Sequence, residues 1–382
     1  MLKSVLPVIP SLRANSASWT QQDVSTVSVK STQNLRRNKQ LFLYSLTFPA
    51  LLSQSIDEID PAAHSSERPL VGGQAVMEGV MMRNGDVYGL AVRRQDGSVV
   101  ACRRPWRTFF SSPFFKIPFV RGFPVLLETL ANGIGALNRS AVLAEAEENE
   151  QLSRWQLVLS MIIAVVMACA LFLLAPHFLS LLMFWLNAGG NVEGLSFHLW
   201  DGFYKVCIFM GYLWLISLLP EIQRVLCYHG AEHKTIHAFE QADEVSVSTV
   251  LPMSRLHPRC GTTFLLFVIT ISIILHAVCV PLLLMLVHPA GELSKHALSL
   301  LFKLMLIIPI STLSYELIRF AATLQGGLKA RLLQAPGLVL QRLTTKEPDA
   351  SQVEVAVASL HVALDPEDRH VVDACDYDLE ES

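Results

Sequence analysis

The chain has 382 residues, of which 52% are hydrophobic and only 16% are charged, whereas soluble domains carry about 25% charged residues. That deficit excludes an ordinary soluble composition and points to a lipid bilayer as the partner of much of the chain. The formal net charge of −3 gives no indication of a nucleic-acid partner, and we expect none.

Residues 1–69 differ in composition from the rest of the chain. Up to Ser55 they hold six basic residues and one acidic residue, and an apolar run from Leu41 to Leu52 follows the basic cluster. That run is too short to cross a hydrocarbon core of about 30 Å. It fits a signal or transit peptide, and the alternative is a disordered extension or a wrongly chosen start codon.

Residues 70–154 are expected to form a small cytoplasmic β-meander followed by amphipathic helices. The dipeptides Asn84-Gly85 and Asp96-Gly97 are typical of tight turns, and the residues between them have strand composition. These signals predict three antiparallel strands. From Phe119 to about Glu148, apolar residues recur at helical spacing, which predicts one or two helices lying on the membrane or packed on the meander.

Four membrane spans are predicted, two within residues 155–219 and two within residues 263–320. The clearest is Thr263 to Val287, which has 25 residues without a charge. A His- and Cys-rich link, residues 220–262, joins the two pairs of spans. The predicted fold class is therefore an α-helical polytopic membrane protein of about four spans, with a small cytoplasmic β-meander and amphipathic helices.

The distribution of basic residues predicts the orientation of these spans. The links after the first and third spans contain one basic residue between them, Lys295, whereas the link 220–262 and the segment 321–382 are rich in Lys and Arg. Basic loops stay in the cytoplasm. We therefore expect both termini and the link on the cytoplasmic side of a bacterial membrane, or of an organelle of bacterial descent. The C-terminal segment should form a helix after Pro348 and end in an acidic tail.

The most informative motif is Tyr228-His229-Gly230-Ala231-Glu232-His233-Lys234, in the link. Pro220 suits the first turn of a helix, which predicts a surface helix from Glu221 to about Gln241. Residues four apart on a helix lie one turn above each other, so His229 and His233 can bind one cation. Glu232 lies beside them as a base for a metal-bound water. The order H-x-x-E-H is the inverted zincin signature.

A second cluster, in which His257 and Cys260 are three residues apart, closes the link. With His229 and His233 it gives a nitrogen and sulfur ligand set suited to zinc or another divalent transition metal. Four ligands would make a closed, structural site. Three would leave a position for water, with Glu232 as the general base and Arg255 or Arg259 steadying an oxyanion. The alternative is a polar helix face without metal.

Glu78 is the third candidate feature, within the string from Gly72 to Arg83. On a strand it would share one face with Gln74 and with apolar side chains. A buried carboxylate needs a partner. Glu78 is therefore expected either to join the metal site, as a ligand or through a bond to a metal-bound histidine, or to form a structural ion pair.

At these residues the chain resembles the YqhQ-like family, uncharacterised bacterial integral membrane proteins that are labelled predicted metal-dependent enzymes. The resemblance implies a membrane protein with the matching strings on its cytoplasmic side, and it implies no substrate. The strings run in order over nearly the whole chain after residue 70, at residues 72–81, 116–119, 228–234, 254–257, 259–261, 336–338, 343–349 and 352–356.

Two functions follow from these features. The first is a metal-dependent hydrolase at the membrane surface, with His229, His233 and either His257 or Cys260 as ligands and Glu232 as the base. The second is a non-enzymatic membrane assembly or scaffold factor, in which structural zinc clamps the link to the meander. A transporter is disfavoured, because no span is expected to carry a paired ionisable cluster near its middle.

Overall fold

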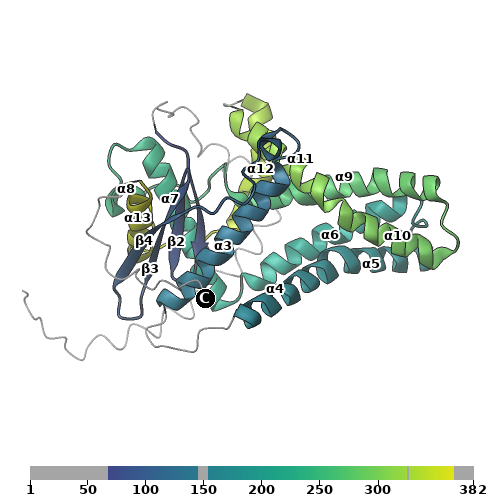
Figure 1. Cartoon of the computed structure of the whole chain (residues 1–382), viewed down its shortest axis with the longest axis horizontal. Helices are drawn as coiled ribbons and strands as arrows, with labels where there is room; N and C mark the ends of the chain where they lie inside the picture. Colours follow the sequence, from purple (N-terminus) through teal and green to yellow (C-terminus); the bar gives the residue numbers. More distant parts are fainter. Residues whose placement is uncertain (1–67, 145–153, 325–326, 365–382) are drawn as a thin grey trace, which may run out of the picture. The chain divides into compact units, whose positions relative to one another are not determined.

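A computed structural model describes residues 68–144, 154–324 and 327–364 (Figure 1). The interpretations given above for residues 1–67 and for the acidic tail after residue 364 fall outside these ranges. Within them the chain is mainly helical and contains one small antiparallel sheet, as the sequence predicted.

The sheet has four strands in sequence order, one more than the sequence predicted. Residues 74–80, expected to form one strand, instead make a hairpin that turns at Met77 and Glu78, where Glu78 has a φ of +49°. No Asn-Gly or Asp-Gly dipeptide marks that turn, which is why the composition did not reveal it. The predicted turns at Gly85 and Gly97 are confirmed. The strands are β1 (Val71–Val76), β2 (Gly79–Asn84), β3 (Val87–Arg93) and β4 (Val99–Pro105).

Two helices cover opposite faces of this sheet. Alternate residues of a strand point to opposite faces, and Val80 and Met82 share a core with α13 (Ala350–Leu364), whereas Met81 packs in a core with α3 (Gly122–Ala144). The helix after the meander was expected either to lie on the membrane or to pack on the meander. This helix is α3, which packs on the sheet and also contacts α11 (Ile307–Thr323). The helix expected after Pro348 is α13.

The helix that carries the histidine motif is α7 (Pro220–Gln241), which begins at the predicted proline. It packs against β1, β2 and α13, and residues 230–238 are buried. The prediction of a surface helix was therefore wrong. The small residue Ala231 joins the core between α13 and the sheet, which brings the motif into the protein interior rather than to a solvated face.

Four helical segments are long and apolar enough to cross a membrane, in agreement with the four predicted spans: Val158–Trp185, Leu195–Ile216, Gly261–Val287 and Glu292–Ala321. The first contains α4 (Arg154–Cys169), a π-helical stretch and α5 (Ala175–Trp185). The second and third are α6 and α9, and the fourth joins α10 (Glu292–Met305) to α11. Contacts of α6 with α5 and α9, and of α9 with α10 and α11, pack the four segments together.

Three further helices complete the described part of the chain: η2 (Pro113–Lys116), α8 (Val247–Val250) and α12 (Gly327–Thr344). Helix α12 packs on α9, and the segment that follows Thr344 then contacts α7. Lys346 donates its backbone N–H to the carbonyl of Leu226 at 2.8 Å.

Candidate metal centre

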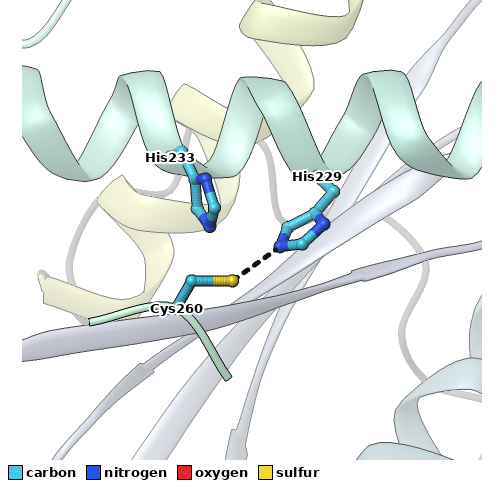
Figure 2. Close-up of side chains that lie close together, drawn as sticks. All are labelled: His229, His233 and Cys260. Carbon is cyan, nitrogen blue, oxygen red and sulfur yellow. Dashed lines mark hydrogen bonds between the residues drawn. The ribbon is translucent and has the colours of Figure 1, made fainter. Parts of the chain in front are cut away.

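Three side chains from two elements meet where α7 passes the start of α9 (Figure 2). His229 and His233 stand on successive turns of α7, and Cys260 caps the N-terminus of α9. One ligand atom from each lies within 4.8 Å of the others. The two imidazole centroids are 4.4 Å apart, and the Cys260 thiol donates to His229 Nε2 at 3.3 Å. The spacing of four residues predicted this histidine pair.

Backbone carbonyls orient both imidazoles. His229 Nδ1 lies 2.8 Å from the carbonyl oxygen of Thr344, and His233 Nδ1 lies 2.6 Å from that of Arg255. A carbonyl oxygen only accepts, so each ring keeps its proton on Nδ1 and presents the Nε2 lone pair towards Cys260. His233 Nε2 is buried and has no hydrogen-bond partner among the described residues. Metal-binding histidines are held in this way.

The environment of Cys260 lowers the pKa of its thiol. Burial by itself would raise the pKa of the thiol, but the nearby His233 and the hydrogen bonds from Thr262 outweigh burial and hold the pKa below its ordinary value. A thiolate is the form of cysteine that binds metals. The donor set, two neutral imidazoles and a thiol with a lowered pKa, therefore fits a borderline-soft divalent ion.

Glu232 is a buried carboxylate next to these ligands. Burial raises its pKa to about 8, although the neighbouring His229 opposes that rise. Among the described residues, none donates a hydrogen bond or forms an ion pair to its carboxylate. Gly73 in β1 leaves room for the Glu232 side chain, because a Cβ added at Gly73 would come within 2.8 Å of the Glu232 Cγ and Oε1 atoms.

A second group, formed by His237, Glu240 and His257, follows one turn further along α7. Its atoms are already paired: His237 Nε2 donates to the carbonyl of Leu256 at 2.9 Å, and Arg259 forms an ion pair with Glu240. The backbone N–H of Arg259 donates to His257 Nδ1 at 3.3 Å. The structure thus separates His257 from Cys260, and its ring centroid is 5.7 Å from that of His233.

The remaining predicted residues are engaged elsewhere. The Arg255 guanidinium hydrogen-bonds the carbonyl and, at 3.0 Å, the hydroxyl of Thr345. Glu78 forms a two-point ion pair with Arg224 near the start of α7, with Arg224 Nε 2.6 Å from Glu78 Oε1. An ion pair was one of the two alternatives predicted for Glu78. The turn position, rather than a strand face, brings its carboxylate to α7.

Sequence reasoning missed Gly73 and the carbonyls that orient the histidines. Every residue carries a carbonyl, so no motif marks Thr344 or Arg255 for this role. Gly230 offered a signal within the motif itself. A Cβ there would lie 2.0 Å from the carbonyl oxygen of Lys346, so glycine allows the segment after α12 to approach α7 and place the Thr344 carbonyl on His229.

Comparisons with known proteins match the region that contains this site. The family model described as "Protein of unknown function (DUF1385)" matches residues 117–366. The chain is 35% identical over 317 residues to "Uncharacterized protein YqhQ" of Bacillus subtilis (strain 168), an alignment that covers 78% of this chain and 92% of that protein. No solved structure gives a significant match.

Proposed function

Given that the chain belongs to the DUF1385 family, as its resemblance to YqhQ predicted, and that this description names no activity, we propose a function from the site itself. The protein is an integral membrane protein in which His229, His233 and Cys260 bind a divalent transition metal. The observation that carries the proposal is the pair of carbonyl-oriented imidazoles, whose Nε2 atoms converge on one sulfur. Zinc is the ion that this donor set suits best.

The metal centre lies at the cytoplasmic surface of the membrane. Cys260 directly precedes the third apolar segment, so its sulfur stands at the end of a membrane span. Basic residues concentrate in the link 220–262 and after the fourth segment, which supports a cytoplasmic position for these parts. The membrane is the bacterial cytoplasmic membrane or that of an organelle of bacterial descent, where thiols stay reduced.

Three protein ligands suit a catalytic site, because a tetrahedral ion then keeps one position for water. A bound divalent metal supplies a water whose pKa falls to about 7. With a metal bound, Glu232 would be the base for such a water, because the positive charge nearby would favour its ionised form. Among the described residues the buried Glu232 carboxylate has no partner, a feature that a purely structural site would not require. The reaction class is metal-dependent hydrolysis at the membrane surface.

A second function is favoured by the position of the ligands. His229 and His233 belong to a helix packed on the sheet, whereas Cys260 belongs to the start of a membrane span. His233 and Cys260 are also both buried. A metal held by all three would tie the sheet to the membrane helices and stabilise the fold, as structural zinc does. The protein would then be an assembly or scaffold factor rather than an enzyme.

One experiment on the detergent-purified full-length protein tests the proposal and separates the two functions. Elemental mass spectrometry measures the bound metal, and chromogenic esters, amides and phosphodiesters in mixed micelles test hydrolysis. For a hydrolase we expect metal and turnover in the wild type, and metal without turnover in Glu232→Gln. Metal without turnover on any substrate class supports the scaffold. Folded wild-type protein that holds no transition metal overturns both.

A further inference from the structure

A network of ionisable side chains joins all four apolar segments, away from the metal centre. The sequence analysis expected no paired ionisable cluster near the middle of a span, and that expectation was wrong. Lys205 stands ten residues after Leu195 and eleven before Ile216, about 15 Å from either end of its segment at about 1.5 Å per residue. The span network consists of His177, Asp201, Lys205, His276, His296 and Lys303.

Asp201 of α6 is the centre of the span network. Its Oδ1 accepts from Lys303 Nζ of α10 at 2.7 Å, and its Oδ2 accepts from Lys205 Nζ at 3.4 Å. Lys205 also donates to His276 Nδ1 of α9 at 3.1 Å and to the Ser272 hydroxyl at 3.5 Å. Asp201, Lys205, Lys303 and His276 are all buried. Such groups inside membrane spans mark ion or proton pathways.

The same series of hydrogen bonds continues to one end of the bundle. Lys303 Nζ donates to His177 Nδ1 of α5 at 3.4 Å, and His177 Nε2 lies 3.0 Å from His296 Nδ1. His296 is only half-buried and lies four residues after Glu292, which begins the fourth segment. The span network therefore runs without a break from this end of the bundle to its middle.

The donors and acceptors in this series fix its direction. An ammonium group only donates, so His177 Nδ1 accepts from Lys303 and His177 Nε2–H donates to His296 Nδ1. His296, whose Nδ1 accepts, then carries its own proton on Nε2. An imidazole bonded through both nitrogens passes a proton by accepting it on one nitrogen and releasing another from the second.

The charges of the span network do not balance. Two ammonium groups face one carboxylate, which leaves one positive charge in a low-dielectric bundle when the imidazoles are neutral. Loss of one proton removes that charge. His198 is also buried, and among the described residues its Nδ1 has no hydrogen-bond partner. Within the described residues of the spans, no three metal-ligating atoms gather within 4.8 Å, so the span network does not form a metal site.

We propose that the span network is a proton path, open at the end of the bundle where His296 lies, that loads and unloads a proton-binding centre at Asp201, Lys205 and Lys303. This gives the protein a proton-coupled function separate from the metal centre, and it requires that the four apolar segments stand in a membrane. In unloading, His296 releases its Nε2 proton and gains the Nε2 proton of His177 on Nδ1. His177 gains a proton from Lys303 on its own Nδ1, and Lys303 becomes a neutral amine.

A path that ends in the middle of the bundle predicts a distinctive electrical signal. A proton that enters from the His296 end crosses only part of the membrane, so a rapid change of pH on that face displaces charge briefly. Proteoliposomes of the full-length protein, adsorbed on a solid-supported membrane, report this displacement as a transient current. We expect the wild type to give that current and protein-free liposomes to give none.

Two histidine variants form the matched comparison. His177→Gln keeps a side chain that can hydrogen-bond and leaves Asp201 and both lysines in place, but it cannot relay a proton, so the transient current should be lost. His288→Asn changes an exposed imidazole at the end of α9, where asparagine suits the φ of +49°, and should keep the current. Elution volume and unfolding midpoint confirm that each variant is folded.

A folded wild type without a transient current overturns the proposal. A current of wild-type size in His177→Gln also overturns it, since the charge would then move by another route. Metal content is measured on the same preparations. Because neither histidine contacts the metal centre through any bond among the described residues, the two proposals fail independently.

Discussion

His233 is fixed by a main-chain atom of Arg255, since its Nδ1 lies 2.6 Å from the carbonyl oxygen of a residue 22 positions further along the chain. Nε2, the nitrogen on the other side of the ring, then faces the Cys260 sulfur and has no partner among the described residues. The imidazole is therefore oriented for a ligand before any ligand arrives. Pre-oriented ligands bind metals more tightly than mobile ones.

Replacement of His233 by glutamine should abolish metal binding, whereas the same replacement of His237 should not. Both residues lie on α7, one turn apart, and both donate a ring proton to a backbone carbonyl. Only His233 has a free nitrogen aimed at Cys260. Elemental mass spectrometry of the two purified variants checks this, with the wild type as reference. Loss of metal in His237→Gln with retention in His233→Gln would assign the ion to His237, Glu240 and His257 instead.

Gly73→Ala should displace the Glu232 side chain, whereas Gly72→Ala should leave it in place. A Cβ at Gly73 would come within 2.8 Å of Glu232, and a Cβ at Gly72 meets no atom within 4 Å. If Glu232 is the base, turnover should fall about 100-fold in Gly73→Ala, with the metal retained. The unfolding midpoint should fall in this variant alone, because the added methyl group crowds a packed site.

Turnover on the substrate class found for the wild type, together with thermal unfolding in detergent, measures both effects. Equal midpoints for the two glycine variants would contradict the packing of β1 against α7. Wild-type turnover in Gly73→Ala, with its midpoint lowered, would remove Glu232 from the reaction while leaving the packing intact.

Local patterns in the sequence predicted the elements that depend on local physics. Pro220 marked the start of α7, the four-residue spacing paired His229 with His233, and apolar runs located the four apolar segments. These features follow from the periodicity of a helix and from the preference of apolar side chains for lipid, and both can be read from residues that are neighbours in the sequence. The hairpin at Glu78 escaped prediction because a two-residue turn without a turn dipeptide leaves no mark in the composition.

Contacts between distant segments could not be predicted. His257 and Cys260 are three residues apart in sequence, yet they belong to different groups, because Cys260 begins α9 while His257 remains beside Glu240. The contacts of Lys205 with Ser272 and His276 of α9 are visible only in the fold. Tertiary packing decides which buried charges pair, and the order of residues along one helix does not reveal that packing.

Glu78→Gln should retain the metal and lower stability only slightly. The carboxylate is paired with Arg224, whose side chain is 61% exposed, and such pairs contribute less than about 1 kcal/mol. A double-mutant cycle with Arg224→Gln, measured by chemical unfolding, should show a coupling energy of that size. Loss of metal in Glu78→Gln would contradict this assignment and return Glu78 to the metal centre.

His237 should make the metal-free protein less stable as the medium becomes acidic. Burial holds its pKa at about 4 in the folded protein, against 6.5 for an ordinary histidine. Between these values the unfolded chain binds a proton that the folded chain does not, so stability is lost as pH falls from about 6.5 to about 4. The full loss is about 3 kcal/mol.

In His237→Gln the unfolding midpoint, followed in detergent with a chelator at pH 7, 6 and 5, should fall less steeply than in the wild type. Wild type and variant share two further contributions: His233, whose pKa burial also lowers to about 4, acts in the same direction as His237, and Glu232, whose pKa burial raises to about 8, acts in the opposite direction. Parallel curves for variant and wild type would show that His237 is protonated equally in both states and is not buried as described.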